Sequence, residues 1–426
     1  MYLTRRVVSY HRQSRASLTK GIPSSSLWTI LSLTLSVGVG LGLPTLSPSC
    51  VVLLGVLQVV SGRWQALLLR HWSFVWRLGL LIGFCIAYLM PMLAYGYTDM
   101  RQVLESLLIW PLAYIVGGSV GTYNRRNHDL ESAWYLVALA SGFALFAWLS
   151  ARGVTSLFAQ QYAYLGRVAP DPWAAGTLAG ASMVGIAGSL GFCLVPALLL
   201  MPLSSASASA FQRLTFRVVV AVIACAGGYG VLRMQARGPL VALAIALLVA
   251  LFVGIKATRG QRQARREFIV GAAVGIVIAV VLWVIVTRNP EWISTTGIAR
   301  IMSEGLSSAR FSAWRLSVQQ LLKYPMGGRQ MSIAGLNYVH NAWLDVLYSS
   351  GIVPFVVLLA FHFSHIRRIG HVLTDVTRPV TALVFGCLIV ATLGGFAAEP
   401  VIDASSLYFA ASCFILGFAA ALGQIE

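Results

Sequence analysis

The chain has 426 residues, of which 58% are hydrophobic and only 10% are charged, and its mean hydropathy is +0.78. These polar residues are too few to coat a soluble globule, so the composition excludes that class and predicts an integral membrane protein. The formal net charge is +18. It is spread over many loops without an aromatic-interleaved basic stripe, so we expect membrane lipids, and no nucleic acid, as partners.

Apolar runs bounded by charged residues predict about twelve membrane-spanning helices, because one span needs about 20 mostly apolar residues. Residues 1–426 are therefore expected to form one all-α polytopic membrane domain, with a long loop at residues 287–351 inside it. The runs centre on Leu27–Leu43, Cys50–Val60, Leu78–Tyr95, Val103–Val120, Ala133–Leu149, Ala174–Met201, Val218–Leu232, Pro239–Val253, Phe268–Val286, Ile352–Phe363, Val380–Phe396 and Leu407–Leu422.

The placement of lysine and arginine predicts the orientation, because positively charged loops stay in the cytoplasm. With the N-terminus inside, 20 of the 31 basic residues are cytoplasmic, and six of the other 11 lie in the long loop. Both termini are then cytoplasmic and the long loop is extracytoplasmic. The basic N-terminal segment leads into a first run without a small-residue cleavage site, so we expect that run to remain as an anchor.

Two patterns in the chain argue against a metal centre. The six cysteines are scattered singly, mostly in apolar runs, and have no metal-binding spacing, so we interpret them as packing residues. No Asp-x-Asp occurs, although many sugar-transferring enzymes use such paired carboxylates to hold a divalent ion against a diphosphate. If this protein handles a diphosphate, arginines must supply the positive charge.

The polar stretch Thr287–Gly351 is the only segment with enough polar residues to build a chemical site. It carries six basic residues against three acids, which favours an anionic ligand. Within it, Ser308–Lys323 has the spacing of an amphipathic helix, with Ser307 or Ser308 as its cap. Its apolar positions are Phe311, Trp314, Val318, Leu321 and Leu322. Arg310 falls in the first turn, where the backbone N–H groups also attract a phosphate.

His340 and Asn341 open a further helix that leads into the membrane. A histidine at a helix N-terminus is biased toward the neutral imidazole, which is the form that accepts a proton. Anchoring at the membrane interface is the alternative role for such a histidine.

Two more arginines lie on short turns of the same outer face. Arg237 follows the seventh run, and Arg167 precedes the sixth. An arginine at an intramembrane turn is costly unless it meets an anion or an acid. The alternative to ligand binding is structural pairing with Glu399, Asp403 or Asp171.

Together these motifs resemble the O-antigen ligase and polymerase superfamily of bacterial envelope glycan transferases. The resemblance covers most of the chain and is sharpest over Val231–Phe355. Ala236 stands where the family typically has serine, so a role for that hydroxyl is not expected here. The matching residues are Ala236-Arg237-Gly238, Arg310-Phe-Ser-Ala-Trp314 with Tyr324-Pro325-Met-Gly327, His340-Asn341-Ala-Trp-Leu344 with Gly351, and Gly166-Arg167 before Pro170.

The resemblance implies a GT-C-like fold in the bacterial inner membrane and a periplasmic active site. The activity it implies is transfer of a glycan from an undecaprenyl-diphosphate donor onto a hydroxyl, without metal or other cofactor. His340 would be the base, Asn341 would orient the histidine or the acceptor, and Arg237, Arg310 and Arg167 would clamp the diphosphate. We include Arg315 and Arg288 as further candidate substrate-binding residues.

Three functions remain open at this stage. A ligase, which we favour, would use a sugar of lipid A-core as acceptor, because that acceptor is highly anionic and the basic surface faces the periplasm. A polymerase would use another carrier-linked repeat unit. A flippase or other transporter for lipid-linked oligosaccharides is the alternative of a different class. The nearly charge-free membrane midplane and the lack of an internal repeat argue against a transporter.

Overall fold

The computed structural model describes most of the chain. The described residues are 26–43, 46–60, 72–123, 129–161, 168–174, 176–202, 208–259, 261–288, 309–333 and 335–422. Arg167, the possible caps Ser307 and Ser308, and residues 289–308 of the long loop lie outside these ranges.

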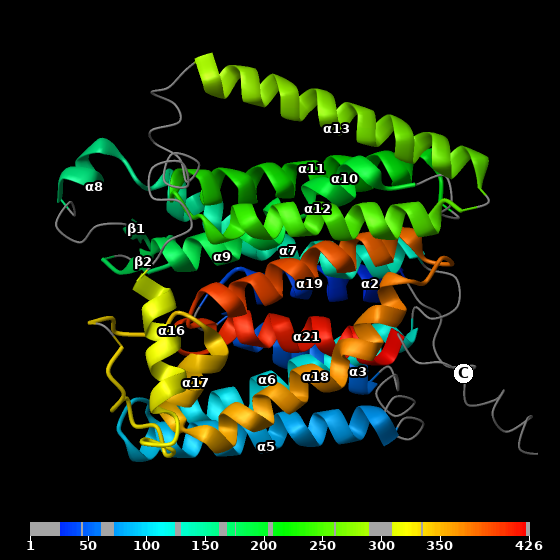
Figure 1. The fold of residues 1–426 in the computed structure, drawn as a ribbon. Helices are drawn as coiled ribbons and strands as arrows, with labels where there is room; N and C mark the ends of the chain where they lie inside the picture. Colours follow the sequence, from blue (N-terminus) through cyan, green and yellow to red (C-terminus); the bar gives the residue numbers. More distant parts are fainter. Residues whose placement is uncertain are drawn as a thin grey trace, which may run out of the picture.

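The described part of the chain is almost entirely helical, and each of the twelve apolar runs coincides with a helix or a pair of helices (Figure 1). The exception is a small antiparallel sheet of β1 (Val168–Pro170) and β2 (Leu178–Gly180). The helices are α2 (Ser26–Gly40), α3 (Leu46–Val60), α5 (Trp72–Ala94), α6 (Met100–Tyr123), α7 (Asp129–Arg152), α8 (Ser156–Gln161), α9 (Ala181–Phe192), α10 (Val195–Leu200), α11 (Ala210–Arg233), α12 (Gly238–Ala257), α13 (Arg262–Arg288), α16 (Ala309–Gln320), α17 (Ala342–Ser350), α18 (Ile352–Leu373), α19 (Pro379–Ala398), α20 (Val401–Ala404) and α21 (Ser406–Leu422).

Within the described ranges, eight helical segments are long and apolar enough to cross a membrane. These are α5, α6, α7, the α9–α10 pair, α11, α12, α18 and α19, whereas α2, α3 and α21 are shorter apolar helices. The expectation of an all-α polytopic membrane protein is confirmed at this level, apart from the small sheet. A total of twelve spans stays a prediction.

In a membrane, lipid tails are as apolar as the helix surfaces, so helices associate mainly by close packing. Small residues permit this packing. A Cβ atom added to Gly117 of α6 would lie 2.0 Å from the carbonyl oxygen of Phe414 in α21. Gly417 of α21 approaches Tyr114 of α6 in the same way. These two helices therefore form a tight central pair, and glycine is required at their contact.

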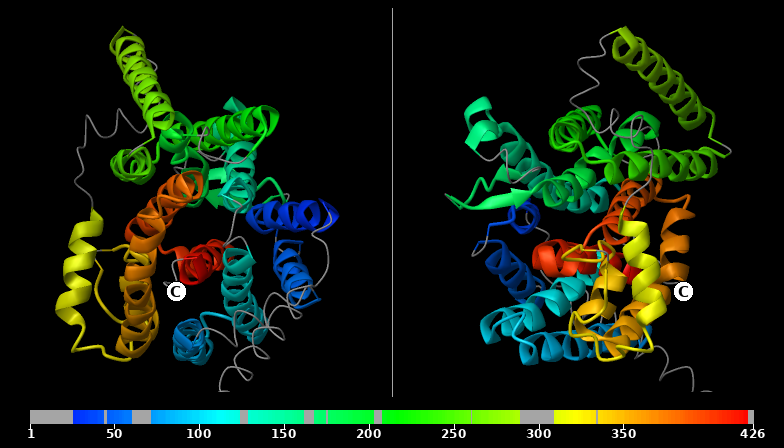
Figure 2. Two further views of the ribbon diagram at one scale, coloured as in Figure 1. Left: turned by 90° about the vertical axis from the view of Figure 1, so that its right-hand side faces the viewer. Right: turned by 60° about the vertical axis from the view of Figure 1, so that its left-hand side comes forward.

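The polar elements gather at one end of the helix bundle. Figure 1 shows α16, α17, the β1–β2 hairpin and the turn between α11 and α12 at the same end, and the views in Figure 2 agree. Helix α13 lies at the edge of the bundle, where it packs on α10 and α12. The described part of the long loop from α16 to α17 and the Arg237 turn thus lie at the same end of the bundle.

Helix α16 confirms the predicted helix within Ser308–Lys323, and its most buried residues are small. Ala313 and Ser317 are fully buried against the protein, while Phe311, Val318 and Leu322 are exposed by 51%, 57% and 85%. The small residues permit close packing on α17, and Trp314 packs on the same inner side, where its Nε1 donates to the Val339 carbonyl. Phe311 and Val318 lie on the outer face of the helix.

Candidate functional site

The end of helix α19 organises the site. The last carbonyls of a helix lack partners within it and must be satisfied by other donors. The side-chain amide of Asn341 donates to the Ala397 carbonyl at 3.3 Å, and Nη1 of Arg310 donates to the Ala398 carbonyl at 2.6 Å. The polar stretch is therefore fixed on α19 through two residues that the sequence singled out.

Glu399, the next residue, joins the two candidate groups. Its Oε1 lies 2.9 Å from Nη2 of Arg310, and its Oε2 lies 3.0 Å from Nδ1 of His340. A carboxylate accepts hydrogen bonds, so Nδ1 of His340 carries the proton in this contact. In the neutral ring, Nε2 then holds the lone pair. The arrangement leaves His340 able to accept a proton on its far nitrogen.

Asp345 holds the backbone around His340. Its Oδ1 accepts a hydrogen bond from the Val339 N–H at 2.6 Å, and its Oδ2 accepts one from the Asn341 N–H at 3.0 Å. His340 itself has a φ of 57°, which places it in the left-handed region. That conformation costs roughly 1–2 kcal/mol for a residue with a Cβ atom. The buried carboxylate stabilises this strained position from both sides.

Asn341 is also the N-cap of α17. Its Oδ1 accepts from the Leu344 N–H at 3.1 Å, so the helix begins directly after the histidine, as the sequence indicates. The partially positive helix N-terminus therefore lies beside His340. The amide of Asn341 therefore acts on the histidine through the backbone, by starting α17 and by binding the end of α19.

The turn that carries Arg237 packs on the same end of α19. Arg237 precedes α12, and a Cβ added to Gly238 would lie 3.4 Å from the Cβ of Ala398. Ala398 is the residue before Glu399, so the turn that carries Arg237 lies beside the carboxylate that Arg310 and His340 share. The cations of this end of the bundle favour an anionic ligand.

The other predicted arginines behave differently. Arg315 is exposed on α16 and Arg288 is exposed at the end of α13, and the described geometry brings neither to Glu399. Arg167 lies outside the described residues, although Val168, the residue after it, begins β1.

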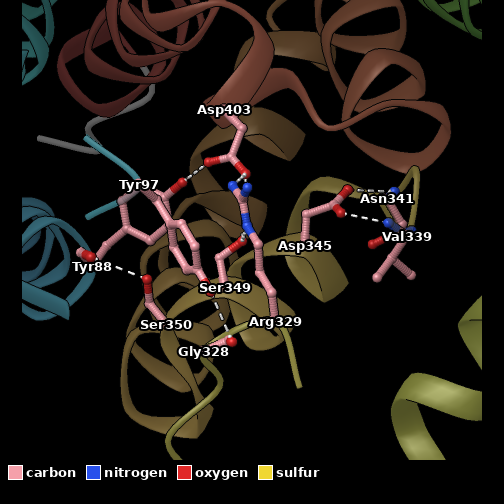
Figure 3. A network of polar contacts seen from close by, with 10 residues as sticks. All are labelled: Tyr88, Tyr97, Gly328, Arg329, Val339, Asn341, Asp345, Ser349, Ser350 and Asp403. Atoms are coloured by element: carbon pink, nitrogen blue, oxygen red, sulfur yellow. Dashed lines mark hydrogen bonds and ion pairs between the residues drawn. The ribbon is translucent and has the colours of Figure 1, made fainter. Parts of the chain in front are cut away.

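A second network lies beside this cluster (Figure 3). Asp403 of α20 pairs with Nη2 of Arg329 at 3.1 Å, and the hydroxyl of Tyr88 in α5 donates to the same carboxylate. The Arg329 guanidinium also lies over the ring of Tyr97, 4.2 Å from its centroid, and 5.4 Å from that of Tyr338. Arg329 is thus fixed between two aromatic rings and an acid.

The position of Arg329 follows from the preceding loop. Its backbone N–H donates to the Tyr348 carbonyl at 2.9 Å, at the end of α17. Gly327 and Gly351 meet backbone to backbone, because a Cβ added to Gly327 would lie 2.5 Å from the backbone nitrogen of Gly351. Both glycines also have positive φ angles. The Pro-x-Gly block and Gly351 are therefore one structural unit that presents Arg329.

A cavity of about 550 Å³ opens between α5, α6, α20 and Arg329. Tyr338 lines it, and the ring of Tyr338 is 6.5 Å from that of His340. A wall residue of the cavity thus lies two positions before His340 in the chain. Its polar lining consists of Tyr88, Tyr97, Thr98, Asp99, Arg101, Gln102, Glu105, Ser106, Arg329, Tyr338, Asp403, Ser405 and Ser406, with Trp110 among the apolar residues.

Burial dominates the electrostatics of the two acids beside the site. It raises the pKa of Asp345 from 3.8 to about 7, opposed by the hydrogen bonds from Val339 and Asn341 and aided by the negative charges of Asp403 and Glu399. Burial also raises the pKa of Asp403, although Tyr88 and Arg329 act in the opposite direction. Both carboxyls hold the site in place through their hydrogen bonds. Ionising them in a buried position costs free energy.

A scan against protein-family models finds no match for this chain, and a search of curated proteins likewise finds none. A functional assignment therefore rests on the chemistry of the site.

Sequence reasoning missed four functional candidates. Glu399 and Asp403 were considered only as structural partners of Arg237 or Arg167, whereas they pair with other groups. Asp345 and Arg329 were counted only as charges of the long stretch. One signal was available in the sequence: Asp345 lies five residues after His340, which is close enough for its side chain to reach the backbone on both sides.

Proposed function

We propose that this protein transfers a glycan from a polyprenyl-diphosphate carrier to a hydroxyl group at the membrane surface. The observation that carries the proposal is the contact of His340 Nδ1 with Glu399, on the same carboxylate that holds Arg310. In this contact His340 can act as a base through its second ring nitrogen, Nε2. The Arg310 guanidinium is held on the same carboxylate. Base and cations are what glycosyl transfer from a diphosphate requires.

In this reaction, Nε2 of His340 accepts the proton of the incoming hydroxyl. The hydroxyl oxygen forms a bond to the anomeric carbon, while the bond from that carbon to the phosphate oxygen breaks. The diphosphate leaves with the electron pair, and Glu399 stabilises the resulting imidazolium. A diphosphate is a good leaving group, so the step needs no general acid.

Arg310 and Arg237 supply the positive charge for the leaving diphosphate. A guanidinium has five N–H donors, and the contacts of Arg310 with Glu399 and Ala398 set the direction of its fork. The geometry of such a fork matches phosphate oxygens and its charge is permanent. Glu399 positions Arg310 and His340 next to each other. The arginine can then neutralise the leaving diphosphate while the histidine removes the proton of the hydroxyl.

The cavity beside Tyr338 is the proposed acceptor site. Its aromatic and amide groups suit a sugar, and its acids Asp99, Glu105 and Asp403 outnumber Arg101 and Arg329. A net acidic lining repels phosphate groups, so we expect the acceptor sugar itself, and not its phosphates, to enter.

Within this activity we favour an O-antigen ligase of the bacterial inner membrane, which acts on the periplasmic face and uses a sugar of lipid A-core as acceptor. Undecaprenyl diphosphate is the proposed carrier, and the helix surfaces give its tail an apolar setting. The same chemistry serves a polymerase that joins carrier-linked repeat units, so the acceptor distinguishes the two functions.

The test uses purified protein with an undecaprenyl-diphosphate-linked glycan and a lipid A-core acceptor. The proposal expects release of undecaprenyl diphosphate and a new glycosidic bond in stoichiometric amounts. Vesicle uptake of labelled donor without any new bond would contradict it and favour a transporter. Product formation only when a second carrier-linked glycan replaces lipid A-core would identify a polymerase.

A further inference from the structure

A second cavity, of about 800 Å³, lies at the far end of the bundle from His340. Helix α12 begins beside the site and its 20 residues extend for roughly 30 Å, and α13 begins five residues after it ends. The cavity is formed by the start of α13, the end of α10 and the third turn of α11. Its lining residues are Leu198, Leu199, Arg217, Arg262, Gln263, Arg266, Glu267, Val270, Gly271 and Val274.

One stripe of α13 changes from charged to apolar along the cavity. Arg262, Arg266, Val270 and Val274 follow one another at intervals of four residues, so they lie on one side of the helix. The stripe is roughly 18 Å long, at 1.5 Å per residue. Its charged half is at the helix start and its apolar half runs into the region that the sequence places in the membrane. This polarity matches that of a membrane lipid.

The wall of the cavity opposite α13 also has an apolar half and a charged half. Leu198 and Leu199 of α10 face the apolar half. Gly271 closes the contact, because a Cβ added there would lie 1.8 Å from the carbonyl oxygen of Leu199. Arg217 of α11 joins the charged half, where its Nη2 donates to the Met201 carbonyl at 3.3 Å. The cavity thus has a basic mouth built from two helices above an apolar floor.

We propose that this cavity binds one anionic phospholipid, with its phosphate at Arg262, Arg266 and Arg217 and an acyl chain along Val270 and Val274. Three arginines against the single Glu267 give the mouth a positive charge. That charge repels the ammonium group of a zwitterionic head group and attracts a head group whose net charge is negative. The apolar floor distinguishes a lipid from a free phosphate ion.

The site is independent of the proposed transfer reaction. A lipid here would link α13 to α10 and α11, and α13 has few other neighbours in the described structure. The bound lipid would therefore stabilise α13, which leads directly into the long loop.

The test measures binding of phosphatidylglycerol to the delipidated full-length protein by native mass spectrometry. We expect one tightly bound lipid per chain and weaker binding of phosphatidylethanolamine. The double variant Arg262→Ala/Arg266→Ala should bind phosphatidylglycerol roughly thirtyfold more weakly, since each cation near a membrane surface contributes about fivefold. Arg259→Ala is the matched control, because Arg259 is exposed on the same connection but does not line the cavity.

A second variant separates a lipid from a free anion. Val270→Glu places a carboxylate on the apolar wall and should abolish tight binding of phosphatidylglycerol. Equal binding by wild type and the arginine double variant would overturn the proposal. Displacement of the lipid by millimolar inorganic phosphate, or unchanged lipid binding in Val270→Glu, would also overturn it. All variants change exposed residues, and size-exclusion profiles check that they remain folded.

Discussion

Asp345 accepts hydrogen bonds from the two backbone N–H groups that flank His340, at 2.6 Å from Val339 and 3.0 Å from Asn341. The acid thus holds the histidine in its left-handed conformation without touching its ring. The same acid is buried and lies in the first turn of the short helix α17. Positioning of the candidate base is therefore built into the local chain and does not depend on a substrate.

Asp345 should make stability depend on pH. Its pKa is raised from 3.8 to about 7, mainly by burial. Between these values the folded protein retains a proton that the unfolded chain has lost, so the free energy of unfolding falls as pH rises from about 4 to 7 and is then constant. The contribution is at most a few kcal/mol.

Thermal unfolding in detergent from pH 5 to pH 8 tests this. Asp345→Asn should flatten the pH dependence, and it should lower the unfolding temperature at pH 5 because one backbone N–H loses its acceptor, at about 1–3 kcal/mol. Asp99→Asn removes an exposed acid and is the control. An equal pH dependence in wild type and Asp345→Asn would contradict this interpretation.

Glu399→Gln should reduce turnover strongly while the protein stays folded. The amide keeps the shape of the side chain but loses the charge that orients His340 and Arg310. A positioned base contributes about 10²–10⁴-fold, and we expect a large part of this to be lost. Single-turnover transfer with saturating donor measures the effect. Turnover within twofold of wild type would exclude a role for the carboxylate.

Arg310 and Arg315 lie on the same helix but should differ in effect. Arg310→Lys keeps the charge but loses the planar fork whose two nitrogens contact Glu399 and the Ala398 carbonyl separately, so we expect a loss of about 10–100-fold in kcat/KM. Arg315→Lys changes an exposed side chain and should leave the rate nearly unchanged. Steady-state kinetics with varied donor makes the comparison. Equal losses in both variants would favour a general effect of surface charge.

Chelation should not slow the reaction, because arginines carry the charge of the leaving diphosphate in the proposed mechanism. Transfer is measured before and after dialysis against EDTA, with added magnesium as the second arm. A loss of activity that magnesium restores would refute the arginine clamp.

The sequence predicted the helices well because the runs of apolar residues are long and the charges between them are few. His340, Asn341 and Arg310 were also identified, since polar groups stand out in such a chain. The contact between His340 and Glu399 could not be predicted, because 59 residues separate them and their approach depends on how α19 packs.

The apolar pattern of α16 did not show which residues pack on the protein, for a physical reason. Hydrophobic periodicity identifies the core of a soluble protein because apolar surface avoids water. At a membrane the outer face can also be apolar, while small residues such as Ala313 and Ser317 permit close helix contacts. The pattern therefore located the helix, but not the outward position of Phe311 and Val318 relative to the rest of the protein.

The central claim is that His340 is the base in glycan transfer. A lipopolysaccharide gel of a strain that lacks this gene, complemented with wild type or with His340→Ala, tests it most directly. The account predicts that wild type restores long glycan chains on the core. His340→Ala should leave bare core and carrier-linked glycan, although the variant protein is present in the membrane. A normal ladder with His340→Ala would contradict the account.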